Sequence, residues 1–162
     1  MCTERSAAVE SWLLTAAPDS AQARAEWAAS GVTRIRCGEV FSAVRIPVEL
    51  VYAAAQAREP GVVDGYLAGA LQGGPVFLDT YWQHFYALVR PDAWARWEAR
   101  DAEGLGHGVE LEVPHPSRTR CEAGRAYWCV PVDAPGQLCE TNAVTQLLDV
   151  ALLRLVGEGA DR

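Results

Sequence analysis

The residues best suited to bind an anion gather in one polar stretch, PHPSRTRCEAGR, at positions 114–125. Ser117, Arg118, Arg120 and Arg125 make this stretch locally basic. An arginine guanidinium can hold phosphate through two parallel hydrogen bonds, and backbone amides in a tight loop can add further donors. The alternative, which we favour, is a solvated loop whose charges face water. These four residues are still the best phosphate-binding candidates that the residue types provide.

Carboxylates that could hold a metal ion come from several segments of the chain. The residues are Asp79, Asp101, Glu103, Glu110 and Glu112. Glu110 and Glu112 are separated by one residue, so on a strand they would share one face. That geometry suits a metal-binding pair, but it is also the geometry of an ordinary solvated strand face, which is far commoner. We therefore expect no metal cofactor, and Mg²⁺ only if these carboxylates form a relocated site.

The composition is that of a globular protein with an acidic balance. Half of the 162 residues are apolar, which is enough to fill a core, and the net charge is −7. An acidic chain repels nucleic-acid phosphate on average, because such binding depends on lysine and arginine displacing counterions. No apolar run approaches the ~20 residues of a membrane helix. The first residues do not resemble a signal peptide, so we expect no membrane partner.

Cysteine usage predicts a cytoplasmic location. The five cysteines are widely spaced and form no CxxC pair, which indicates reduced thiols rather than a disulfide framework or a zinc site. A cysteine–histidine nucleophile would need Cys37 or Cys129 beside His84, and nothing in the spacing places them together. The sequence contains no Ser-His-Asp order, no P-loop and no dinucleotide-binding glycine motif.

Apolar periodicity predicts helices that alternate with strands. Val9, Trp12 and Leu13 form the stripe of a first helix. Asp19 is a suitable N-cap for a second helix, with Gln22 three residues later, and Gly31 suits its C-terminal end. The expected helices are 4–16, 20–30, 47–58, 62–71, one that opens at 90–92, and 141–156; the expected strands are 32–37, 40–46, 75–79, 84–89, 109–113 and 126–130.

This order of elements predicts an α+β fold, a mixed or antiparallel sheet with helices mostly on one face. We expect a first hairpin around Gly38-Glu39, a second hairpin with its turn at 80–83, and a glycine-rich loop at 101–108. Most of the six tryptophans suit the core, but Trp82 falls in the second turn, where an exposed ring could stack on a base. The chain divides into a helical extension, an α+β domain and a frayed tail, at 1–30, 31–157 and 158–162.

Five stretches, taken in order, carry a resemblance to a known family. They are CGEVFSAVRIP at 37–47, GPVFLD at 74–79, QHFYALVRP at 83–91, GHGVELEVPHPSRT at 106–119 and AYWCVP at 126–131. The chain resembles the small actinobacterial relatives of the bifunctional DNA primase/polymerase N-terminal domain, the prim-pol branch of the replication-related archaeo-eukaryotic primases. The likeness covers roughly residues 28–156. Each stretch is a soft motif alone, whereas their order and spacing together are more specific.

The resemblance implies a primase-like fold and a particular active site. Active members bind two metal ions through strand carboxylates, and a histidine on a neighbouring strand contacts the phosphate of the incoming nucleotide. His84 is similar in position to that histidine. Ser42 and Arg45 stand where relatives tend to carry aspartate, and a serine is a poor Mg²⁺ ligand while an arginine repels the ion. The resemblance therefore implies a degenerate member that does not transfer nucleotides.

Three functional hypotheses follow. The first is a non-catalytic accessory or regulatory module that acts through protein contacts, including a homodimer if an apolar helix face is exposed at 4–16 or 141–156. The second is a module that binds a nucleotide or single-stranded nucleic acid in a phosphate pocket at His84 and the 117–125 loop. A positive groove joining the arginines at positions 34, 36, 118 and 120 would favour this second hypothesis. The third is an enzyme of other chemistry on the same scaffold.

Overall fold

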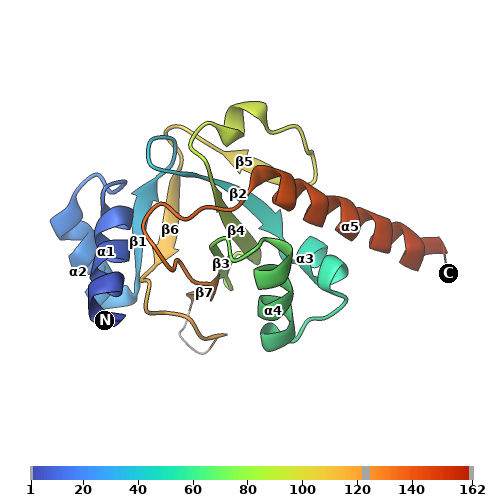
Figure 1. Ribbon diagram of the computed structural model, residues 1–162, viewed down its shortest axis with the longest axis horizontal. Helices are drawn as coiled ribbons and strands as arrows, with labels where there is room; N and C mark the ends of the chain where they lie inside the picture. Colours follow the sequence, from blue (N-terminus) through green and yellow to red (C-terminus); the bar gives the residue numbers. More distant parts are fainter. Residues whose placement is uncertain (1, 122–124, 161–162) are drawn as a thin grey trace.

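A five-stranded antiparallel sheet forms the centre of the molecule (Figure 1). The computed structural model describes the backbone of residues 2–121 and 125–160, and the side chains of residues 4–121 and 125–157. The strand order is β5-β2-β4-β3-β7, with bounds β2 (Ser42–Pro47), β3 (Val76–Asp79), β4 (His84–Val89), β5 (Glu103–Leu105) and β7 (Ala126–Val130). The expected α+β class with an antiparallel sheet is confirmed.

A separate two-stranded ribbon pairs β1 (Val32–Arg36) with β6 (Glu110–Pro114). The expected hairpin between the first two strands is therefore wrong. The reason is that β2 pairs with β4 on one side and with β5 on the other, which leaves no edge for β1. Residues 37–41 instead carry the chain from the ribbon to the sheet, and the Cys37 N–H donates to Val109 O at 2.8 Å.

The second expected hairpin is confirmed, and one expected loop contains a strand. β3 and β4 are adjacent and antiparallel, with Asp79 opposite His84. Within the glycine-rich stretch 101–108, the three residues of β5 pair along the outer edge of β2, with Gly104 opposite Val44. A Cβ atom on Gly104 would lie 2.9 Å from the Cβ of Trp97. Glycine at this position thus permits a tryptophan to pack flat against the edge strand.

Apolar layers cover both faces of the sheet. One layer packs the sheet against α3 (Val48–Ala55), α4 (Pro60–Ala70) and α5 (Thr141–Ala160). The other packs it against the ribbon, α1 (Cys2–Leu14) and α2 (Ser20–Ser30). Figure 1 shows these two groups at opposite ends of the view, with the sheet between them. The expectation that helices lie mostly on one face is therefore wrong, because the two N-terminal helices cover the second face together with the ribbon.

The N-terminal helices form as the sequence predicts. Asp19 caps α2, and its side chain accepts the Gln22 N–H; Gly31 ends the helix with φ at 81°. Val9 and Leu13 are buried, as the stripe of α1 requires. The Trp27 indole of α2 donates to Val113 O of β6 at 3.0 Å. These contacts join the helices to the ribbon and so fix the wall of the site described below.

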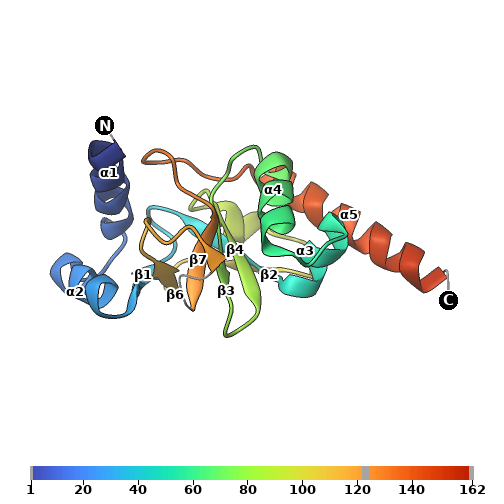
Figure 2. The same cartoon turned by 90° about the horizontal axis from the view of Figure 1, so that it is seen from below.

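Helix α5 continues past the main body of the molecule (Figure 2). It runs to Ala160 and not to the expected end at Gly157. Its first half packs into the core, whereas Leu153 and Val156 are 73% and 70% exposed. The remaining helical segment, expected to open at 90–92, is the single 3₁₀ turn η1 (Ala93–Arg96). Among the described residues, no helix is long and apolar enough to cross a membrane.

Candidate functional site

A hollow of about 460 Å³ opens between the five-stranded sheet and the ribbon. We call it the inter-sheet hollow. The sheet contributes one side and the ribbon contributes the other. Its lining residues are Arg34, Arg45, Asp79, Trp82, His84, Tyr86, Glu110, Leu111 and Glu112.

The sheet side of the hollow is built by facing positions of β2 and β4. Arg45 lies opposite Tyr86 in the register, and both side chains leave the same face of the sheet. The Arg45 Nε donates to the Tyr86 hydroxyl at 3.3 Å, and its guanidinium lies 5.6 Å from the centre of that ring. Arg45 also pairs with Glu103 of β5 at 3.0 Å. Arg45 is thus held in place by a ring and a carboxylate, with its side chain about one third exposed.

His84 begins β4 and lies two residues before Tyr86, so both side chains are on the same face of the sheet, with 6.4 Å between their ring centres. Burial lowers the pKa of His84 below its ordinary value; the nearby Arg45 lowers it further, and Asp79 and Glu103 partly oppose the change. The imidazole is therefore neutral at pH 7. A neutral imidazole offers one donor and one acceptor, and it can take up a proton when an anion binds beside it.

Arg125 joins the two sheets through two carboxylates. Its guanidinium lies 3.6 Å from Asp79 Oδ2 on β3 and forms an ion pair with Glu112 Oε2 on β6. Asp79 is only 3% exposed, and Glu112 Oε2 is buried. Buried charges of this kind require a partner, because their desolvation is otherwise costly. The Arg125 cation supplies that partner and lines the adjoining hollow beside α2.

The β3–β4 turn presents two aromatic rings at the edge of the hollow. Asp79 Oδ1 accepts the backbone N–H groups of Tyr81 and Trp82 at 3.0 and 3.1 Å, which is the side-chain-to-backbone pattern that favours aspartate in turns. Gln83 adopts a left-handed conformation with φ at 59°, and its side chain donates to Thr80 O at 2.6 Å. Tyr81 and Trp82 remain 71% and 60% exposed. The turn is thus internally hydrogen-bonded while its rings face outward.

The ribbon side of the hollow carries charges of both signs. Arg36 pairs with Glu110 at 3.6 Å. Arg34 lines the hollow from β1, opposite Glu112 in the register. Within the described part of the chain, Arg34 makes no ion pair or side-chain hydrogen bond. It is therefore the arginine of the hollow whose donors are available to a ligand.

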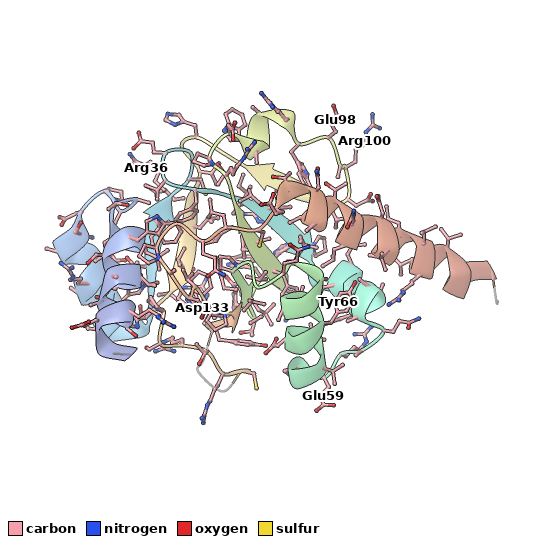
Figure 3. The ribbon with its side chains drawn as sticks, in the orientation of Figure 1. Arg36, Glu59, Tyr66, Glu98, Arg100 and Asp133 are labelled. Carbon is pink, nitrogen blue, oxygen red and sulfur yellow. The ribbon has the colours of Figure 1, made fainter. Side chains whose placement is uncertain are left out.

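Two further hollows adjoin the first. One of about 370 Å³ shares Arg45 and His84 with it and also includes Arg100, which Figure 3 labels on the segment before β5. The other, of about 540 Å³, shares Arg34 and Glu112 and is walled by α2 and Arg125. We refer to the three hollows together as the trough; the first lies between the two sheets, and the second is lined by β2, β4, β5 and the segment before β5.

The structure separates the loop candidates from His84. Ser117 is engaged locally, because its Oγ lies 2.8 Å from His115 Nδ1. Arg118 packs over Gly31, where an added Cβ would lie 2.0 Å from the guanidinium carbon. Neither these two residues nor Arg120 lines the inter-sheet hollow. Arg125 does not line it either, but it pairs with two residues that do, Asp79 and Glu112.

The degenerate metal positions do not share a face. Ser42 is fully buried and donates to Pro91 O at 2.7 Å, whereas Arg45 lines the hollow. Positions three apart on a strand point to opposite faces, as the alternation predicts. The residues present also do not fit a two-metal centre: Arg125 and Arg36 already pair with the carboxylates of the hollow. No cluster of three metal-ligating side chains occurs among the residues that the structure describes.

Neither Cys37 nor Cys129, the two cysteines considered as nucleophiles, is suited to act with His84. Cys37 is 1% exposed, and burial raises the pKa of its thiol to about 12. Cys129 lies in the apolar layer under α4, and burial raises the pKa of its thiol well above the usual value. A thiol in this state is inert, because only the thiolate is a good nucleophile. Close to Cys129, the Tyr127 hydroxyl donates to Asp64 at 3.3 Å, and burial raises the Asp64 pKa.

Sequence reasoning singled out His84, Trp82 and the carboxylates, but it missed Tyr86. The signal was present, because His84 and Tyr86 are two apart on a strand and must share a face. Arg34 was named only as an extension of a basic patch on the first hairpin. Its true position beside His84 depends on the pairing of β1 with β6, which local pattern does not reveal.

Comparison of the chain with protein-family models, with curated proteins and with solved structures found no match in any of the three.

Proposed function

We propose that this chain is a non-catalytic, prim-pol-like module that binds a nucleotide in the inter-sheet hollow. The supporting observation is that His84, Arg45 and Arg34 line one hollow together with an exposed tryptophan. Arginine and histidine are suited to phosphate, and a volume of about 460 Å³ lies within the range of small-molecule sites. A cytoplasmic location belongs to the same proposal.

The pairing of the carboxylates in the hollow supports a module that does not transfer nucleotides. Nucleotidyl transfer by two metal ions needs closely placed carboxylates that are free to bind both. In the hollow, Asp79 and Glu112 pair with Arg125, and Glu110 pairs with Arg36. We expect no template-dependent synthesis in the presence of Mg²⁺. Detection of such synthesis, or of two bound divalent ions, would contradict this part of the proposal.

Calorimetric titration of the purified protein with nucleotides tests the binding function. His84→Ala and Arg34→Ala should each weaken binding about 10-fold or more, because a hydrogen bond to a charged group contributes roughly 1.5–3 kcal/mol. Two matched controls remove the same side-chain types outside the hollow: His107→Ala and Arg120→Ala, both at exposed positions. They should change the affinity less than about twofold. Loss of binding in Arg120→Ala, with no effect at positions 34 and 84, would place the anion site in the 114–125 loop instead.

Helix α5 favours a second candidate function, contact with another protein chain. Leu153 and Val156 lie three residues apart on one face of the projecting segment and are largely exposed. A second copy of the same helix is the partner we propose, because an isologous contact needs only one self-complementary face. Its test is described in the Discussion, at the scale of the element.

A further inference from the structure

We infer that the ligand of the inter-sheet hollow is a nucleoside monophosphate whose base stacks on Trp82; this inference deepens the nucleotide-binding function proposed above and rests on it. It names the charge of the ligand and the residue that recognises its base. Two independent observations carry it, the placement of Trp82 and the balance of charges along the trough.

Trp82 is placed to receive a planar ring. It lines the hollow and yet remains 60% exposed, which is unusual for the largest apolar side chain. Tyr81 supports it from the side, with an edge-to-face contact at 5.0 Å between ring centres. The Arg125 guanidinium in turn lies 5.6 Å from the centre of the Tyr81 ring. The outer face of Trp82 is therefore oriented before a ligand arrives, and little side-chain entropy is lost when a base stacks on it.

The phosphate end of the ligand lies toward the arginines of the same hollow. Arg34 has its donors available, and Arg45 is fixed by Tyr86 and Glu103. His84, two residues before Tyr86 on β4, lines the same hollow as both arginines. These groups come from β1, β2 and β4, whereas Trp82 comes from the β3–β4 turn. The ligand thus has a polar end held by three segments and a flat end held by a fourth. A nucleotide has this division between phosphate and base.

The charge balance selects a ligand of low charge. Four arginines and six carboxylates line the trough formed by the three adjoining hollows: Arg34, Arg45, Arg100 and Arg125, against Glu26, Asp79, Asp101, Glu103, Glu110 and Glu112. A single phosphate, with about two negative charges, can be met by Arg34, Arg45 and a protonated His84. A metal-free triphosphate would bring further charge against the carboxylates. A nucleic-acid strand would add one negative charge per nucleotide along a trough that has no excess of cations.

The experiment compares four probes on the full chain by calorimetry: AMP, ribose 5-phosphate, ATP without Mg²⁺, and an oligothymidylate. AMP should bind about 10-fold tighter than ribose 5-phosphate, because the base adds one stacking contact. ATP and the oligothymidylate should bind no tighter than AMP. Trp82→Ala should weaken the affinity for AMP about 10-fold and change the affinity for ribose 5-phosphate by less than about twofold. Trp82→Phe should restore most of the AMP affinity.

Trp94→Ala is the matched control, since it removes another exposed tryptophan ring, 43% exposed, that does not line the hollow. It should change AMP affinity less than about threefold. Equal affinity for AMP and ribose 5-phosphate, with both weakened by His84→Ala, would overturn the role of Trp82 while the phosphate site stands. ATP or oligothymidylate binding more than about 10-fold tighter than AMP would overturn the selection for low charge. Failure of all four probes to bind would overturn the proposed function itself, and this inference with it.

Discussion

Asp79 uses both of its carboxylate oxygens for structure. Oδ1 accepts two backbone N–H groups of the β3–β4 turn, and Oδ2 faces the guanidinium of Arg125. A carboxylate with both oxygens engaged and only 3% exposure cannot bind a metal ion without releasing the turn that carries Trp82. The same residue that looks like a metal ligand in the sequence thus organises the aromatic side of the hollow.

At His84, the lowered pKa gives nucleotide binding a pH dependence. In the free protein, burial and the nearby Arg45 disfavour the cation and lower the pKa of His84 below its ordinary value. A bound phosphate raises the His84 pKa, so binding takes up a proton between the pKa of the complex and that of the free protein. Affinity should therefore increase as the pH falls through this window, by roughly 3- to 10-fold between pH 8 and pH 6.

Calorimetry of AMP binding across this pH range measures the effect. The phosphate of AMP also titrates near pH 6 and contributes to the pH dependence in every variant. The quantity to compare is therefore the slope of log affinity against pH for the wild type minus the same slope for His84→Ala. The variant should lose the increase at low pH, and His107→Ala should keep it. Identical slopes in the wild type and His84→Ala would show that the histidine takes no part in proton-linked binding.

Among the elements, α5 packs into the core over its first half and is exposed over much of its second half. Ala143, Leu147 and Leu148 are buried in the layer over the sheet, and Arg154 donates to Ala54 O at the end of α3. On either side of that anchor in the sequence, Leu153 and Val156 are exposed. Two apolar side chains offer far less than the ~800 Å² per partner of a standard interface. Self-association through this face is therefore weak, and it needs a high protein concentration.

Sedimentation velocity over a wide concentration range tests this contact. The wild type should form a concentration-dependent dimer, at about 100 μM and above for an interface this small. Leu153→Glu should abolish it, because a carboxylate would have to be buried without a partner. Gln146→Glu, which introduces the same charge at an exposed polar position of α5, should leave association unchanged. A monomer at every concentration would argue against α5 as a contact surface.

Elements with strong local signals were predicted well, and their pairing was not. The cap at Asp19, the stop at Gly31 and the β3–β4 turn depend on residues a few positions apart. The partner of β1 depends instead on which edges of the sheet other strands have already taken. The sequence did not predict β5, because its three residues include Gly104 and are too few to show an alternation of apolar and polar side chains.

At the scale of the molecule, the site exists only where the two sheets meet. The Trp128 indole of β7 donates to Pro114 O at the end of β6, and Trp27 reaches the same strand from α2. Arg34, Trp82 and His84 come from distant segments, so no local pattern could place them in one hollow. The positive groove joining positions 34, 36, 118 and 120, which would have favoured nucleotide or nucleic-acid binding, does not form, because Arg36 pairs with Glu110, and Arg118 and Arg120 lie outside the hollow.

The ribbon packs against α1 and α2 in one buried layer, so we predict that the N-terminal helices unfold together with the sheet. Leu13 of α1 is completely buried in the layer that also contains Ile35, Phe77 and Trp128. Leu13→Ala should therefore lower the free energy of unfolding by about 2–5 kcal/mol, the range for large-to-small substitutions in a core. Leu153→Ala, the same substitution at a 73% exposed position of α5, should cost less than about 0.5 kcal/mol.

Urea denaturation followed by tryptophan fluorescence and by circular dichroism measures both variants. If the helices and the sheet unfold together, the two signals of Leu13→Ala shift to lower urea by the same amount and remain superimposed. Nucleotide affinity in the folded variant should also fall, since a loosened ribbon displaces Arg34 from His84. A main transition that stays at the wild-type midpoint would mean that residues 1–30 fold as a separate extension. The ribbon side of the hollow would then have to be held by the five-stranded sheet alone.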